Sequence, residues 1–375
     1  MLKGTGKTIR YALKCERLLK QEQYTFDCEK HPFILKSNAI FIAAETDGKN
    51  DTLFFDTGYS GFVSETATSD TDFKIRPVIS RSMQTATRRL WQKQGLSVHD
   101  IRTPWVDISN CVCELTCSNL EEKSICHQKK KSEYKCVGFS LTPNYYGHSI
   151  MLSFSDTTMQ LLDSNTGYDT TDYVRVPADF SHSVLFMRLK IDSVEHSFLF
   201  DTGCDQYLLL KSHNTHAKPG DRAFFGEIGQ DASGTITDTT YLQFTRIQTF
   251  GTYSDSIPVF YLKQFHFNIM GLGLISCYDW IIDRQHKVMY AKKIHSKTLN
   301  LEDIAPYSVK EHDSSLVITR IPILENGKVL PLGTRIRSVD GVSVTSDNIC
   351  HYKQLLNSTT DWSIFRIEYE EPEKE

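Results

Sequence analysis

The sequence predicts a mainly β protein in which two related β units are followed by a small α+β module. A strand-rich segment occurs twice, each copy contains a polar hairpin turn, and the C-terminal segment places strands around one helical stripe. A chain of 375 residues is also too long for one ordinary core, which indicates two or three domains. The expected domain boundaries are 1–167, 168–297 and 298–375.

Composition and charge limit the classes of partner. Hydrophobic residues make up 40% and charged residues 23% of the chain, which is typical of a globular protein. The formal net charge of −4 gives no basic excess for binding nucleic acid. No apolar run approaches the roughly 20 residues of a membrane helix, and the N-terminus lacks the apolar core of a signal peptide. We expect no nucleic acid partner and no membrane span, and we favour a cytoplasmic location.

One segment of the chain repeats after 145 residues without a gap. The stretch AIFIAAETDGKNDTLFFDTG (39–58) aligns with VLFMRLKIDSVEHSFLFDTG (184–203), and the apolar positions coincide. Each stretch predicts a strand, a polar turn, a second strand and then Asp-Thr-Gly. The repeats are named copy one (39–163) and copy two (184–293) below.

The two copies also agree downstream. Copy one reads CVGFSL around Gly138, copy two reads IMGLGLIS around Gly271, and both continue into a predicted hairpin with a polar tip. Gly138 follows Asp56 by 82 residues, whereas Gly271 follows Asp201 by 70. We assign the extra length of copy one to its Cys-rich stretch, because surface loops tolerate insertions best.

The repeat places a carboxylate at the same position of each copy, because Asp56 and Asp201 each follow a predicted apolar strand. Two repeats in one chain usually pack about a pseudo-twofold axis, which would bring the two Asp-Thr-Gly turns together. Adjacent carboxylates cannot both ionise easily, so they share a proton and act as one acid and one base. One Asp could deprotonate a water while the other protonates the carbonyl oxygen that this water attacks. The pattern predicts hydrolysis of an amide without a metal, a cofactor or a covalent intermediate.

The residues that follow each Asp suit this arrangement. Gly58 and Gly203 allow a tight turn close to the carboxylates, where a Cβ atom could clash. Thr57 and Thr202 carry hydroxyl groups that can form hydrogen bonds across the junction of the copies. We expect these four residues to support the active-site loops.

These motifs resemble the aspartic proteases of the retropepsin and pepsin superfamily. FFDTGYSGF and FLFDTGCDQYLLL resemble its two active-site loops, and the motifs at Gly138 and Gly271 resemble the apolar-apolar-Gly element that braces each loop. The four elements occur in the family's order over residues 33–293. The resemblance implies two pseudo-twofold related acid-protease β-barrel lobes, catalytic Asp56 and Asp201, and a peptide or protein substrate. It also implies an active monomer, because both Asp residues are in one chain.

The C-terminal segment resembles a PDZ domain through LPLGTRIRSVDGVSV, and bacterial proteins with two retropepsin-like lobes and a PDZ-like tail share this layout. Strands are predicted at 316–319, 335–339 and 362–369, with a helix capped by Ser346 or Asp347. A PDZ domain would bind an extended peptide by adding it as a strand. However, the segment before the first strand, EHDSS, is no glycine-rich carboxylate loop. A peptide-binding role and a purely structural role of this module both stay open.

Two positions depart from the family pattern. Tyr59 and Cys204 stand where the family usually has Ser, Thr or Ala, so the small hydroxyl beside the carboxylate is replaced by a phenol in copy one and is missing in copy two. A catalytically inactive protein that keeps the cleft and binds peptides is therefore the alternative function. An active dyad with a less stabilised anion should work best in weak acid or near neutrality.

Two hairpins are candidates for covering the cleft. FGEIGQDASGTITDTTYLQF (225–244) contains several glycines and predicts a mobile cover in copy two. SRSMQTATRRLWQKQGLSV (80–98) is its counterpart in copy one.

Other motifs give no support to a different chemistry. Five of the ten cysteines lie between Cys111 and Cys136, but no C-x-x-C pair occurs, so free thiols or a disulfide are favoured over zinc. KGTGKT (3–8) lacks the first Gly of a phosphate loop and the strand before it. No G-x-S-x-G or H-E-x-x-H motif indicates a serine hydrolase or a zincin.

Overall fold

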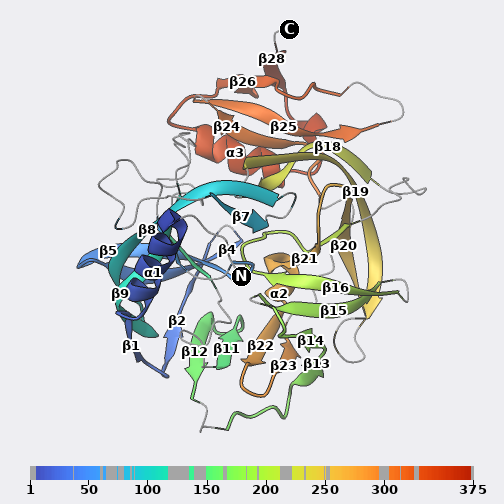
Figure 1. The fold of residues 1–375 in the computed structure, drawn as a ribbon. Helices are drawn as coiled ribbons and strands as arrows, with labels where there is room; N and C mark the ends of the chain where they lie inside the picture. The colour runs from blue at the N-terminus through green and yellow to red at the C-terminus, as the bar shows by residue number, and fades with distance from the viewer. Residues whose placement is uncertain are drawn as a thin grey trace.

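The structure of the chain is a computed structural model, and Figure 1 shows its fold. It describes residues 6–372 except for 37, 60–61, 65–73, 75–79, 85–86, 88, 117–134, 139–148, 164–166, 183, 192–193, 212–221, 232–233, 249, 251–253, 295–303, 313 and 325–328. Within the described residues the protein is mainly β, as predicted, with three sheets and three α-helices. None of these helices is long and apolar enough to cross a membrane.

The secondary-structure elements fall into four groups along the chain. The N-terminal segment contains α1 (Gly6–Leu19), β1 (Gln23–Phe26), β2 (Lys30–Pro32) and β3 (Ile34–Lys36). Copy one contains β4 (Ala39–Thr46), β5 (Lys49–Asp56), β6 (Phe62–Ser64), β7 (Ser80–Gln84), β8 (Arg89–Arg102), β9 (Val106–Thr116), β10 (Lys135–Gly138), β11 (Ser149–Ser153) and β12 (Thr158–Leu162).

Copy two follows two short strands, β13 (Val174–Val176) and β14 (Ala178–Asp179). It contains β15 (Phe186–Ile191), β16 (Val194–Asp201), β17 (Leu208–Lys211), β18 (Arg222–Asp231), β19 (Gly234–Gln248), β20 (Ser254–Leu262), β21 (Asn268–Gly271), α2 (Leu272–Ile275), β22 (Tyr278–Asp283) and β23 (Val288–Lys293). The C-terminal module, residues 304–372, contains β24 (Ser308–His312), β25 (Ser315–Ile323), β26 (Arg335–Val339), β27 (Val342–Ser343), α3 (Ile349–Ser358), a 3-10 turn (Trp362–Ile364) and β28 (Ile367–Glu370).

Each copy closes a ring of paired strands, and the two rings have the same order. In copy one the order is β9-β6-β10-β5-β4-β8, and β8 pairs back to β9. In copy two it is β20-β17-β21-β16-β15-β19, and β19 pairs back to β20. In both rings the strand that ends in Asp lies parallel to the strand that ends in the downstream Gly. The sequence repeat is therefore a structural repeat.

The hairpin before the first Asp-Thr-Gly is confirmed. β4 pairs with β5 in an antiparallel register that places Thr46 opposite Lys49. Asp47 and Gly48 form the two-residue turn with φ angles of 51° and 76°, and two left-handed residues are what a type I′ hairpin turn requires. β15 and β16 form the matching hairpin in copy two.

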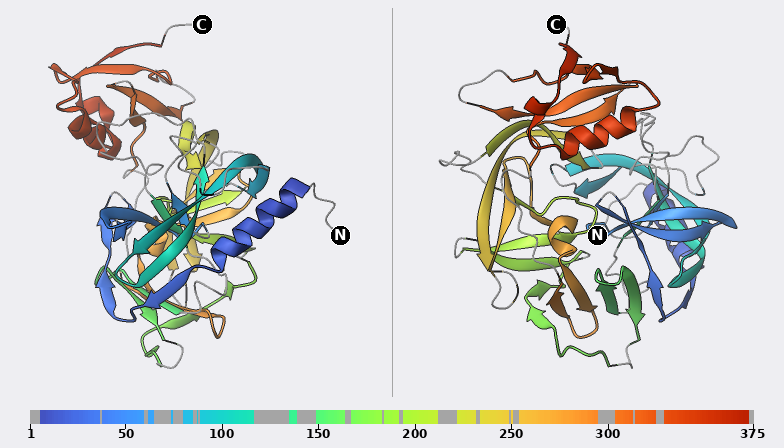
Figure 2. Two further views of the ribbon diagram at one scale, coloured as in Figure 1. Left: turned by 60° about the vertical axis from the view of Figure 1, so that its left-hand side comes forward. Right: turned by 180° about the vertical axis from the view of Figure 1, so that it is seen from behind.

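A second sheet joins the two copies. Its order is β13-β23-β22-β11-β12-β2, so β11 of copy one pairs with β22 of copy two. Leu152 lies opposite Trp280 at this junction. Figures 1 and 2 show this sheet at one end of the molecule and the C-terminal module at the other, with the two rings between them.

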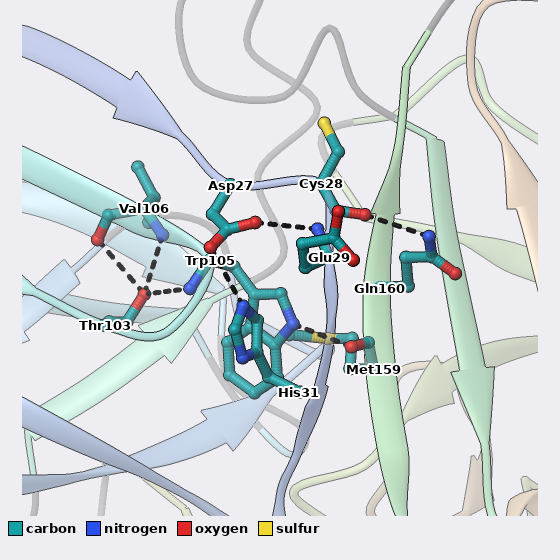
Figure 3. Close-up of polar contacts among 9 residues, drawn as sticks. All are labelled: Asp27, Cys28, Glu29, His31, Thr103, Trp105, Val106, Met159 and Gln160. Atoms are coloured by element: carbon teal, nitrogen blue, oxygen red, sulfur yellow. Dashed lines mark hydrogen bonds and ion pairs between the residues drawn. The ribbon is translucent and has the colours of Figure 1, made fainter. Parts of the chain in front are cut away.

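Polar contacts connect the ring of copy one to this shared sheet, as Figure 3 shows. Trp105, in the turn between β8 and β9, donates its indole N–H to the carbonyl oxygen of Met159 on β12 at 2.7 Å. Gln160 on the same strand donates to the carbonyl oxygen of Cys28 at 2.9 Å. Trp105 is 2% exposed, so its bond to Met159 satisfies an indole N–H that burial would otherwise leave without a partner, while the bond of Gln160 connects β12 to the N-terminal segment.

One hydrophobic core runs through both copies and the shared sheet. Phe200, which directly precedes Asp201, packs edge-to-face against Trp280 with ring centroids 5.1 Å apart. Both side chains are fully buried. Burial of large aromatic side chains of this kind is worth about 2–3 kcal/mol each, and here it fixes the strand that carries the second Asp.

The C-terminal module has its own core and also extends the sheet of copy two. Its buried cluster includes Leu316, Ile336, Ile349 and Trp362. β25 pairs with β18, so the sheet of copy two continues into the module. Figure 1 shows the module in orange and red beside β18.

Three details of the predicted module are corrected. The helix starts one residue after Asn348, so neither Ser346 nor Asp347 is its N-cap. The strand predicted at 316–319 is longer, because its far end pairs with β18. The strand predicted at 362–369 begins as a 3-10 turn, because Asp361 accepts a hydrogen bond from Ser363 N and Trp362 turns into the core.

Candidate active site

The two predicted active-site Asp residues stand at the ends of equivalent strands. Asp56 closes β5 and lies opposite Gly138 of the parallel strand β10. Asp201 closes β16 and lies opposite Gly271 of the parallel strand β21. The three residues before each Asp are buried, whereas both Asp residues are partly exposed. The buried apolar strands thus place the two carboxylates at partly exposed positions where copy one and copy two meet.

Thr57 and Thr202 interlock the two loops. Thr57 N donates to Thr202 Oγ1 at 3.1 Å, and Thr202 N donates to Thr57 Oγ1 at 2.9 Å. Each hydroxyl then donates across the junction, from Thr57 to Phe200 O at 2.7 Å and from Thr202 to Phe55 O at 2.8 Å. The two threonines are 1% and 0% exposed. The exchange of equivalent bonds is the local pseudo-twofold symmetry predicted from the repeat.

Each Asp carboxylate lies against the glycine of the opposite loop. A Cβ atom built on Gly58 would lie 2.6 Å from Cγ of Asp201, and one built on Gly203 would lie 2.6 Å from Cγ of Asp56. Only glycine permits this approach. Within each loop, Gly58 N donates to Asp56 Oδ1 at 2.9 Å and Gly203 N donates to Asp201 Oδ1 at 2.8 Å.

This arrangement can support acid–base chemistry with two coupled carboxylates. Each carboxylate is oriented by a backbone N–H and approached by the opposite loop. Two carboxylates that lie near each other favour a state in which a single proton is shared. Such a pair can take a proton from water and give one to a carbonyl oxygen in the same step.

The two unusual residues of the loops have different surroundings. The hydroxyl of Tyr59 donates to Glu114 Oε2 on β9 at 2.8 Å. Cys204 packs against the apolar cluster formed by β17 to β21, and its carbonyl oxygen accepts from Leu272 N at 2.7 Å. Glu114 was not among the predicted site residues, because no motif marks a partner that lies 55 residues from Tyr59.

Gly271 braces the second loop through its backbone. Gly271 N donates to Tyr207 O at 2.9 Å, and Gly273 N donates to Gln206 O at 3.0 Å. Burial raises the pKa of Tyr207 from 10 to about 12. In copy one, Gly138 occupies the equivalent backbone position on β10.

Gly271→Ala should therefore destabilise the protein. The new Cβ would lie 2.3 Å from Gln206 O and 2.8 Å from Cys204 O, and backbone atoms that must move to relieve such a contact cost about 1–3 kcal/mol. Urea denaturation measures this loss. Gly167→Ala is the control, because no atom lies within 4 Å of the added Cβ. Equal unfolding free energies of the two variants would contradict the bracing role.

The structure describes only part of the Cys-rich stretch, so the prediction of free thiols or a disulfide there can be checked only in part. Cys111 and Cys113 are buried, and their sulfur atoms, 3.9 Å apart, do not form a disulfide with each other. Cys117 and Cys126 lie outside the described residues, and only the backbone of Cys136 is described. Among described residues, no group of three or more His, Cys, Asp or Glu side chains is arranged to hold a metal ion.

Comparison with known proteins adds little to this geometry. No family model and no curated protein matches the chain. A solved structure, basic 7S globulin from soybean, is similar at 8% sequence identity and a TM-score of 0.42, over 72% of this chain and 95% of that chain. A similarity at this level carries no argument about fold or function, so the candidate site depends on the contacts of its own residues.

Proposed function

We propose that this protein is an aspartic endopeptidase with Asp56 and Asp201 as its acid–base pair. The observation that carries the proposal is the reciprocal packing of each Asp carboxylate against the glycine of the other loop. The threonine exchange beneath the carboxylates holds the two loops in register. Paired carboxylates that share a proton can hydrolyse a peptide without a metal or a covalent intermediate.

In the proposed reaction, the pair binds one water and holds one proton. The ionised Asp removes a proton from the water, whose oxygen attacks the peptide carbonyl carbon. The protonated Asp gives its proton to the carbonyl oxygen, which yields a tetrahedral gem-diol. Proton transfer to the amide nitrogen then breaks the C–N bond and releases a carboxylic acid and an amine. The net change is the addition of one water to one amide.

The proposed architecture is two acid-protease β-barrel lobes, at 1–167 and 168–297, with a PDZ-like module at 298–375. The matching strand order of the two rings supports the paired lobes. Because one chain contains both Asp-Thr-Gly loops, the proposed active form is a monomer. The proposed substrate is an extended peptide or a protein segment.

The test is hydrolysis of a peptide library, with and without a statine-type inhibitor that mimics the tetrahedral intermediate. We expect cleavage that statine blocks and that Asp56→Asn removes. Cleavage that persists at the wild-type rate in Asp56→Asn would contradict the role of this carboxylate. No cleavage of any peptide between pH 3 and 8 would reject the endopeptidase proposal.

The second candidate is an inactive protein that binds peptides in the same cleft. It is favoured by the engagement of the Tyr59 hydroxyl with Glu114 and by the apolar packing of Cys204, because neither supplies the small hydroxyl usual beside the dyad. Calorimetry separates the candidates, since a non-catalytic protein would bind statine and peptides without turnover.

The pH profile of hydrolysis should respond to Cys204→Ser. A hydroxyl beside an Asp carboxylate stabilises the charged form, whereas a thiol is a poor donor. The wild-type optimum is expected in weak acid or near neutrality. In Cys204→Ser the acidic limb of the kcat/KM profile should move towards lower pH. Cys277→Ser is the control, because it removes a thiol outside the loop. A wild-type optimum in strong acid that Cys204→Ser leaves unchanged would contradict this explanation.

A further inference from the structure

The C-terminal module is joined to copy two by a strand pair. β18 and β25 are antiparallel, with Ala223 opposite Ile323 and Gly226 opposite Arg320. β18 is one arm of the hairpin predicted to cover the cleft, and its other edge pairs with β19 of the ring. Over residues 223–226 both edges of this arm are therefore paired, whereas residues 227–231 pair as a strand with β19 alone. The junction limits motion at the base of the hairpin and not at its tip.

Gly226 is adapted to this junction. Its φ of 137° is a conformation that residues with a side chain rarely adopt. A Cβ atom at this position would lie 2.2 Å from Thr319 O and 2.7 Å from the Cα atom of Arg320. The close approach of β25 to β18 therefore depends on a glycine here.

Arg320 extends the contact towards the second active-site loop. Its guanidinium carbon lies 4.8 Å from the ring centroid of Phe224, and Nη2 donates to Ala305 O at 3.2 Å. Burial lowers the pKa of Arg320 to about 10, and the negative charge of Asp205 acts in the opposite direction. Asp205 belongs to the loop that begins at Asp201. Phe224 in turn belongs to the apolar cluster against which Cys204 of the same loop packs, so the contact of Arg320 with Phe224 connects the module to that loop.

The module's own outer strand edge is partly occupied. Asn357 on α3 accepts from Val309 N at 2.9 Å and donates to Val309 O at 3.0 Å. One side chain thereby satisfies both backbone groups that an added peptide strand would need at this point of β24. This contact favours the structural role of the module over capture of a peptide at that edge.

We infer that the C-terminal module is a positioning element of the cleft, in which β25 fixes the base of the β18–β19 hairpin and Arg320 supports Phe224. The inference rests on the proposed function, since the cleft is taken to bind a peptide substrate. Arg320 is a positioning residue here, because it acts through Phe224 and not on substrate. The module is then a required part of the enzyme.

The first experiment perturbs the strand junction in the full chain. Gly226→Ala should increase amide hydrogen exchange in β18 at least about tenfold, whereas Gly229→Ala should not, because nothing lies within 4 Å of a Cβ at Gly229. This measurement does not require catalysis. If the exchange difference appears but no peptide is cleaved, the endopeptidase proposal is wrong, whereas the proposed support of β18 by β25 is confirmed. Equal exchange in the two variants would show that β25 does not support β18.

The second experiment tests Arg320 through activity. Arg320→Met should lower kcat/KM about tenfold or more, mainly through KM, and Arg320→Lys should recover part of the loss because it keeps the positive charge. Arg366→Met is the control, since that side chain is 81% exposed on the same module. If Arg320→Met lowers the unfolding temperature but leaves KM and kcat unchanged, Arg320 has a structural role only and the inference is wrong for this residue.

Discussion

Replacing Asp56 or Asp201 by asparagine should lower kcat/KM for peptide hydrolysis by about 10³-fold or more, while the fold is retained. Asparagine has nearly the same shape, and its amide oxygen can still accept the hydrogen bond that Gly58 N donates at 2.9 Å in the native protein. An amide cannot exchange protons with water or with the substrate carbonyl. Both variants should lose activity, because one carboxylate supplies the base and the other the acid.

The comparison needs a matched surface change and a stability measurement. Asp347→Asn provides the first, since Asp347 is exposed in the C-terminal module. Urea denaturation provides the second and should show unfolding free energies within about 1 kcal/mol for all three variants. Retention of wild-type kcat/KM in either Asp56→Asn or Asp201→Asn would refute a shared dyad.

The repeat made the centre of the site predictable from sequence. Alternating and apolar patterns indicate strands locally, but they do not show which strands meet. The offset of 145 residues supplies that missing information, because equivalent residues of two packed copies meet near the axis. It paired Thr57 with Thr202, and these two side chains do exchange hydrogen bonds. The same offset related Gly58 to Gly203, which each lie against the opposite Asp.

Contacts outside the repeat could not be predicted in this way. Among the described residues of copy one, no strand pairs with β7 as β25 pairs with β18, so the repeat could not indicate this junction. The hydrogen bonds of Asn357 with Val309 and of Tyr59 with Glu114 join residues far apart in the chain. Such contacts are determined by how elements pack, and local sequence patterns carry no information on that packing.

The same limit explains the errors in the C-terminal module. A helical stripe indicates a helix, but several polar residues before it can act as the cap, and the structure begins the helix after Asn348. Trp362 fits a strand by propensity. Its indole N–H donates to Leu356 O at 2.9 Å in the core, and this tertiary contact outweighs the local preference.

The threonine exchange gives the second large expected effect, on stability. Thr202→Val keeps the shape of the side chain but removes its hydroxyl. Thr57 N then loses its acceptor at 3.1 Å, and Phe55 O loses the donor at 2.8 Å, in a site from which water is excluded. Leaving buried polar groups unpaired costs about 1–3 kcal/mol each, so with two such groups Thr202→Val should lower the unfolding free energy by roughly 2–6 kcal/mol.

Thr202→Ser distinguishes the contribution of the hydroxyl group to stability from that of the methyl group. Serine keeps the donor and the acceptor, so its cost should be about 1 kcal/mol, the value of one buried methyl group. By the same symmetry, Thr57→Val should cost as much as Thr202→Val, because its hydroxyl makes the equivalent pair of bonds. Urea denaturation of the four variants, with Thr57→Ser as the fourth, measures these differences. If each valine variant is as stable as its serine partner, the two loops are held together by packing alone and not by the exchanged hydrogen bonds.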